Sequence, residues 1–187
     1  RMHGVKDYYD LPYLLKSYPK IKQTFNFAPS LMIQIDEYVS GKVKDRVQIL
    51  SEKPASALSK AEKQEILNQF FICNLDNLIK PSPRYFELYQ KYSSGADADK
   101  FSTQEMLDLQ VWYNLSWIGE VSKQDKKISE LIQLDRNFSE SDKKYILDYH
   151  LQVLGKISDI MNELKNSGQI EISCSPEYHP ILPILID

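Results

Sequence analysis

The sequence has few cysteines and no excess of positive charge. Cys73 and Cys174 are its two cysteines, and they lie far apart in the chain. A small disulfide-stabilised secreted scaffold needs a denser set, so the pair is better interpreted as two free thiols in a reducing compartment. The predicted location is therefore cytoplasmic. The net charge of −3 provides no basic surface for a phosphate backbone, which argues against nucleic-acid binding.

Long apolar runs and metal-binding motifs are also missing. No apolar stretch approaches the ~20 residues needed to cross a bilayer. The sequence contains no CxxC motif, no HExxH motif and no cluster of cysteine and histidine. We therefore expect no membrane partner, no metal and no cofactor, and the sequence does not indicate an oligomeric state.

The two ends of the sequence are unusual for a complete domain. Residues 1–4 (RMHG) have neither the cationic nor the apolar region of a signal peptide. Asp187 follows an apolar stretch that is typical of a buried segment, whereas chain ends are usually polar and exposed. We therefore expect a fragment of a longer protein.

The order of predicted elements is a strand, a long helical region and a second strand. Residues 22–27 form a short run that contains Thr24, Phe25 and Phe27 and ends before Pro29, and residues 169–174 alternate polar and apolar side chains with a period of two. This order favours two neighbouring parallel strands of an α/β sheet with an enlarged crossover. Two strands alone do not make a stable sheet, which again indicates that other strands are missing.

Several helices can be placed from their start signals and apolar spacing. Ser59 with Glu62, and Ser102 with Glu105, fit capping boxes. A first short helix is expected to bury one face, and a long helix is expected to end at Gly168. The expected face of the first helix consists of Leu11, Leu14, Leu15 and Tyr18. The expected stripe of the long helix consists of Ile146, His150, Val153, Ile157, Ile160 and Leu164.

Two stretches contain polar residues where a purely structural interpretation is incomplete. Asn26 lies within the apolar first strand, and a local turn is its more common explanation. In the second strand, Gln169 and Glu171 alternate with isoleucines. Glu171 is either a solvated residue on an edge strand or an inward-facing carboxylate at the carboxyl mouth of a barrel. His179 follows in a proline-rich loop, where a single histidine is more often structural than catalytic.

Two aromatic residues are candidates for stacking against a ligand. Trp112 lies on the apolar stripe of its helix, so core packing is favoured for it. Tyr178 follows the second strand and is the better candidate for a ligand contact.

Five segments, in order, resemble glycoside hydrolase family 57. Residues 3–10 (HGVKDYYD) resemble a stretch after the family's first barrel strand, and residues 24–31 (TFNFAPSL) resemble its second strand. Residues 109–117 (LQVWYNLSW) are similar to a helix of its amylase-like members. Residues 168–173 (GQIEIS) resemble its second signature region, and residues 179–183 (HPILP) the usual continuation. The resemblance covers essentially the whole chain.

The resemblance implies a fragment of a (β/α)7 barrel that is mostly helical, with parallel strands around 22–27 and 169–174. Residues 1–187 would form part of a catalytic domain that lacks the first strand and the later catalytic strands. The family acts on α-glucans and maltooligosaccharides by a retaining mechanism. Its nucleophile glutamate and its acid/base aspartate would lie beyond this chain, so we assign no catalytic residue here and expect the fragment to be inactive.

Of the family's functional positions, only Glu171 can be carried over, as a substrate-contacting residue. Gln169, His179 and Tyr178 are expected as its substrate-binding neighbours. Two other hypotheses stay open: a noncatalytic family member that binds saccharides, and a helical interaction module without sugar chemistry.

Overall fold

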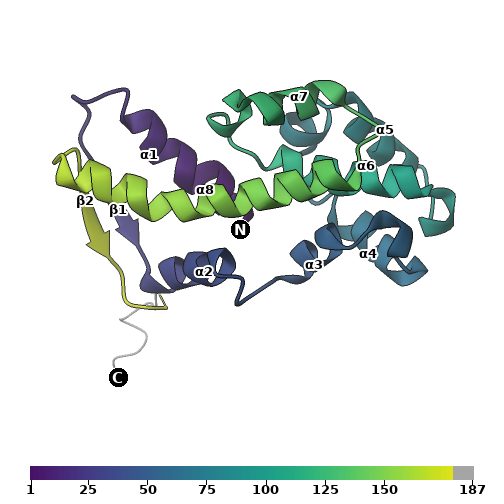
Figure 1. The fold of residues 1–187 in the computed structure, drawn as a ribbon, viewed down its shortest axis with the longest axis horizontal. Helices are drawn as coiled ribbons and strands as arrows, with labels where there is room; N and C mark the ends of the chain where they lie inside the picture. Colours follow the sequence, from purple (N-terminus) through teal and green to yellow (C-terminus); the bar gives the residue numbers. More distant parts are fainter. Residues whose placement is uncertain (179–187) are drawn as a thin grey trace. The chain divides into compact units, whose positions relative to one another are not determined.

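The structure is a computed structural model, and it describes residues 1–178. Contacts divide the described chain into two compact units, one containing the sheet and the other entirely helical. The sheet unit comprises residues 3–43 and 151–178, and the helical unit comprises residues 44–150. Figure 1 shows the elements of each unit. The predicted mixture of many helices and two parallel strands is confirmed, which agrees with an α/β fragment.

The sheet unit contains two strands and the helices that pack against them. Its elements are η1 (Gly4–Tyr8), α1 (Tyr9–Leu15), β1 (Gln23–Phe27), α2 (Pro29–Val39), the second half of α8 (Glu140–Asn166) and β2 (Ile170–Cys174). The strands are parallel, and their register aligns Thr24 with Glu171 and Asn26 with Ser173. Both strand predictions are therefore confirmed to within one residue at each end.

Helix α8 supplies much of the core through a single apolar stripe. All six residues predicted for this stripe are buried. The helix ends as expected at Gly168, whose positive φ of +67° suits a residue without a Cβ. The backbone N–H of Gln169 then donates to the Leu164 carbonyl at 3.0 Å, which closes the last turn. This turn places β2 directly after the helix.

The predicted buried face of the first helix is confirmed for Leu15 and wrong for its other three residues. The structure buries Val5, Tyr9, Pro12 and Leu15, whereas Leu11, Leu14 and Tyr18 are exposed. The helix ends at Leu15, so Tyr18 lies beyond it, and the buried residues continue the face that begins at Val5 in η1. Gly4 also approaches α8 closely, because an added Cβ would lie 2.4 Å from Cδ2 of Leu154.

The helical unit packs a series of short helices around a buried central helix, α6. Its elements are α3 (Arg46–Glu52), η2 (Ala55–Ala57), α4 (Lys60–Gln69), η3 (Leu75–Ile79), α5 (Pro83–Ser93), η4 (Ala98–Lys100), α6 (Thr103–Ser116), η5 (Ser122–Gln124), α7 (Lys126–Leu134) and the first half of α8. Both predicted capping boxes are present, at the start of α4 and at the start of α6. Each box satisfies two backbone N–H groups that the first helical turn would otherwise leave unpaired.

The capping box of α4 predicts that the stability of the fold depends on pH in the acidic range. Glu62 accepts hydrogen bonds from Lys53 and from Ser59, and these bonds lower the pKa of its carboxyl from 4.5 to about 2. A carboxyl whose pKa is lower in the folded state stabilises the fold above its unfolded pKa. That contribution is lost as the pH falls through the folded pKa.

We therefore expect Glu62→Gln to lower the melting temperature at pH 7 and to have a smaller effect as the pH falls from 4.5 towards 2. Melting curves of both proteins across this range measure the difference. A difference that stays constant with pH would show that Glu62 does not titrate with folding.

Within residues 1–178, no helix is long and apolar enough to cross a membrane. Both cysteines are free thiols, as predicted.

Candidate functional site

The two faces of the sheet differ in chemistry and in cover. Phe25, Phe27 and Ile172 point to one face, against which α2 and α8 lie, and there the two phenylalanines are half-buried while Ile172 is 39% exposed. Thr24, Asn26, Glu171 and Ser173 point to the other face, and all four are exposed in the described part of the chain. Because side chains alternate along a strand, this polar set follows directly from the register. The open polar face is the candidate site.

Glu171 lies on the open face beside Thr24. Among the described residues, no hydrogen bond or ion pair engages its carboxylate. A solvated carboxylate with no structural partner is available to accept hydrogen bonds from a ligand.

The expected position of Glu171 at the carboxyl mouth of the strand is wrong. It is the second residue of β2, three residues before Cys174, so it lies about 10 Å from the strand's carboxyl end. The reason is that β2 begins immediately after the turn at Gly168 and ends only at Cys174. Glu171 lines a shallow depression of about 420 Å³ formed by residues 22–24 and 168–171.

Gln169 is buried, and the structure places it in a different environment from Glu171. Its side chain is 7% exposed, and its amide donates to the carbonyls of Leu15 at 2.7 Å and Tyr18 at 2.9 Å. The carbonyl of Ile21 lies 3.4 Å from the same nitrogen. This amide therefore fixes the loop that leads from α1 into β1. Gln169 would affect a ligand indirectly, by holding that loop in place.

The carboxyl ends of the strands carry a hydrogen-bonded group that the sequence did not reveal as a unit. Asn26 Nδ2 donates to Ser173 Oγ at 2.9 Å, and Ser175 Oγ donates to Asn26 Oδ1 at 2.6 Å. Asn26 therefore bonds across the two strands and not within a local turn, the explanation that its sequence context favoured. The signal was available only once Asn26 and Ser173 were known to be in register.

The segment after β2 continues along the carboxyl end of β1. The backbone N–H of Ser175 donates to the Phe27 carbonyl at 3.1 Å, and the backbone N–H of Ser30 donates to the Glu177 carbonyl at 3.3 Å. Tyr178 follows in a turn and is 81% exposed. Its ring is available for stacking at the same end of the sheet as Asn26. His179, also predicted as a site residue, lies outside the described residues.

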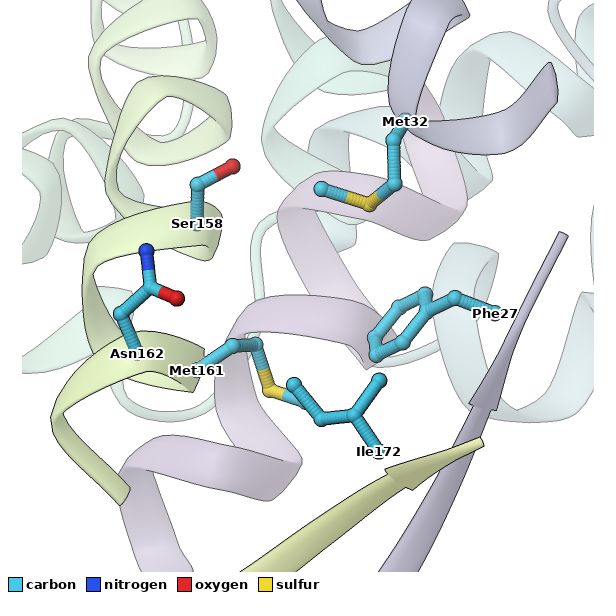
Figure 2. A pocket seen from close by; sticks show the side chains of 6 residues that line it. All are labelled: Phe27, Met32, Ser158, Met161, Asn162 and Ile172. Carbon is cyan, nitrogen blue, oxygen red and sulfur yellow. The ribbon is translucent and has the colours of Figure 1, made fainter. Parts of the chain in front are cut away.

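The covered face contains a second hollow, of about 190 Å³. Figure 2 shows that Phe27 and Ile172 approach it from the strands, Met32 from α2, and Ser158, Met161 and Asn162 from α8. It is a gap in the packing of helices on the sheet, lined mainly by apolar side chains. It lies on the opposite face from Glu171 and shares no residue with the open face.

Trp112 belongs to the core of the helical unit, as predicted. It is 3% exposed, its ring stacks on Tyr85 with centroids 6.4 Å apart, and its indole N–H donates to the Asp135 carbonyl at 2.6 Å. A ring buried in this way has no free face for a sugar.

Titratable groups on the sheet do not form a catalytic pair within residues 1–178. Retention at a glycosidic bond needs two carboxyl groups roughly 5–5.5 Å apart. Glu171 is the single acidic side chain on the two described strands. In this described region, no group of three or more histidine, cysteine, aspartate or glutamate side chains is arranged to hold a metal ion.

Comparison with known proteins agrees with the sequence motifs. The model of the family described as "Glycosyl hydrolase family 57" matches residues 1–187, which is the whole chain. Searches of curated proteins and of solved structures returned no significant match. Because the family match extends over every segment described above, the chain belongs to glycoside hydrolase family 57, a family of carbohydrate-active enzymes.

Proposed function

We propose that this chain is part of the catalytic domain of a retaining, α-glucan-active glycoside hydrolase or transglycosidase. The observation that supports this most directly is the asymmetry of the sheet. Two parallel strands are partly covered by helices on their apolar face and present an open polar face that carries Glu171.

This asymmetry is what a segment of a (β/α)7 barrel requires. In such a barrel the helices pack on the outer face of the strands, side chains fill the inner face, and the substrate meets the residues at the carboxyl ends of the strands. The connection from β1 to β2 runs through α2, the helical unit and α8, so it is a crossover of the kind that joins parallel strands. Under this proposal, residues 1–187 form one partial catalytic domain, and the helical unit is an enlargement of one crossover.

The described residues suggest distinct roles towards an α-glucan chain. Glu171 would accept hydrogen bonds from sugar hydroxyls, because its carboxylate is exposed and unpaired among the described residues. Tyr178 would stack on a sugar ring at the carboxyl end of the strands. Gln169 would contribute by fixing the loop beside Glu171. We keep His179 in the proposed site on the basis of its sequence context alone.

The chemistry itself would come from elsewhere in the parent protein. A nucleophile and an acid/base must both flank the scissile bond, and the two described strands carry one carboxylate between them. We therefore expect the isolated chain to be inactive, and we propose that the nucleophile glutamate and the acid/base aspartate belong to other strands. The free thiols favour a cytoplasmic location for the parent protein.

The test is to incubate the parent protein with maltoheptaose, with the isolated chain as a paired control, and to separate the products by chromatography. Shorter maltooligosaccharides would show hydrolysis, and longer ones would show transfer to a sugar acceptor. Binding of maltoheptaose without turnover would instead support a noncatalytic saccharide-binding protein. If the parent protein neither binds nor turns over maltoheptaose, the α-glucan assignment is contradicted. Turnover by the isolated chain would contradict the absence of catalytic carboxylates from it.

A further inference from the structure

Three uncharged side chains meet at the carboxyl end of the open face. Asn26 on β1 lies in register with Ser173 on β2, and Ser175 follows one residue beyond the end of β2. The Ser175 backbone is held against β1 by its N–H bond to the Phe27 carbonyl at 3.1 Å. The three side chains therefore come from two strands whose relative position is fixed by the backbone ladder.

The hydrogen bonds within this group set the orientation of the Asn26 amide. Ser173 Oγ lies 3.5 Å from the Phe25 carbonyl, to which it donates, so its lone pairs are directed to Asn26 Nδ2 at 2.9 Å. Ser175 Oγ donates to Asn26 Oδ1 at 2.6 Å. The donation from Ser173 to the Phe25 carbonyl thus favours one of the two possible orientations of the amide, and Ser175 donates to Oδ1 in that orientation.

One donor of the amide remains available. A primary amide has two N–H hydrogens, and Asn26 uses one of them for Ser173. Among the described residues no second acceptor for Nδ2 is present, and the Asn26 side chain is exposed. The group therefore presents an oriented N–H donor on the face that also carries Glu171.

The chemistry of this face fits an uncharged polyhydroxyl ligand. Of the four side chains that the strands place there, Glu171 alone is charged, and Thr24, Asn26 and Ser173 are neutral. Sugar hydroxyls are neutral donors and acceptors. An amide N–H can therefore donate to one hydroxyl while a carboxylate accepts a hydrogen bond from a neighbouring one.

We propose that Asn26 is a substrate-contacting residue whose free amide N–H donates to one hydroxyl of the bound α-glucan, and that Ser173 and Ser175 are positioning residues for this amide. The proposal rests on the function proposed above and adds a specific recognition contact to it. Loss of one neutral hydrogen bond should reduce kcat/KM by about three- to tenfold. Loss of a positioning serine should have a smaller effect in the same direction.

The experiment compares Asn26→Ala, Ser175→Ala and the control Asn162→Ala in the parent protein. Asn162 is an exposed asparagine on α8 that lines the hollow on the covered face, so it matches the chemistry but not the location. The readouts are kcat/KM for maltoheptaose and for a set of monodeoxy maltooligosaccharides, together with the melting temperature. We expect kcat/KM of the wild-type enzyme to be about three- to tenfold lower for one deoxy analogue than for the parent sugar. For that same analogue, Asn26→Ala should have the same kcat/KM as the wild type.

The outcomes separate this inference from the function on which it rests. If the wild-type parent turns over maltoheptaose while Asn26→Ala retains wild-type kcat/KM, the inference is overturned and the function stands. The inference is equally overturned if Asn26→Ala shows the same extra loss on every deoxy analogue, as a purely structural change would. Failure of the wild-type parent to turn over maltoheptaose would overturn the proposed function and this inference together.

Discussion

Replacing Asp108 with asparagine is expected to lower the free energy of unfolding of the helical unit by about 3–5 kcal/mol. Asp108 is fully buried on α6, and it accepts a hydrogen bond from Arg84 Nε at 2.8 Å. Its other oxygen accepts from Gln104 Nε2 at 2.9 Å and from the Phe138 backbone N–H at 3.2 Å. The substitution removes the negative charge of Asp108. The largely buried Arg84 guanidinium then keeps one of its two carboxylate partners, the exposed Glu87.

The measurement is thermal unfolding of the variant beside the matched control Asp148→Asn. Asp148 pairs with Lys144 one helical turn away on the exposed side of α8, and such surface pairs contribute about 0.5 kcal/mol or less. For a chain of this size, about 3–5 kcal/mol corresponds to a fall of roughly 6–20 °C in the melting temperature. Equal and small shifts in both variants would show that the Arg84–Asp108 pair does not hold the helical unit together.

Replacing Glu171 with glutamine is expected to reduce kcat/KM of the parent protein on maltoheptaose by at least about tenfold. Hydrogen bonds to a charged group contribute about 1.5–3 kcal/mol, and 1.4 kcal/mol corresponds to a factor of ten. The melting temperature should stay near that of the wild type, because no described residue forms a hydrogen bond or an ion pair with this carboxylate. Glutamine keeps the size and polarity of the side chain, so the loss would report on its charge.

The control for this variant is Ser158→Ala, which alters the hollow on the covered face of the same sheet. It should leave kcat/KM unchanged. A large fall in melting temperature for Glu171→Gln with unchanged kinetics would instead assign Glu171 a structural role.

The features that were predictable from the sequence are those with local signals. The capping boxes at Ser59 and Ser102 need four consecutive residues, and Gly168 ends α8 through its own backbone conformation. The stripe on α8 follows from a spacing that repeats within one helix. Local signals of this kind do not depend on which part of the chain packs nearby.

The features that were missed depend on contacts between distant segments. The hydrogen bonds of Gln169 go to carbonyls of a loop near the start of the chain, so its burial has no local signal. Asn26 and Ser173 became a recognisable pair only after the parallel register of β1 and β2 was known. For α1, the face that is buried continues from Val5 in η1, and the close approach of Gly4 to Leu154 on α8 has no local signal.

The central claim is that the open polar face of the sheet meets the substrate and that the covered face does not. The most direct test is the rate at which a thiol reagent modifies a single cysteine on each face of the parent protein, with and without excess maltoheptaose. Thr24→Cys places the thiol beside Glu171, and Ser158→Cys places it on the covered face, each with Cys73 and Cys174 changed to serine. We expect maltoheptaose to slow modification at residue 24 several-fold and to leave residue 158 unaffected. Equal rates with and without sugar at residue 24, or protection at residue 158 alone, would contradict the claim.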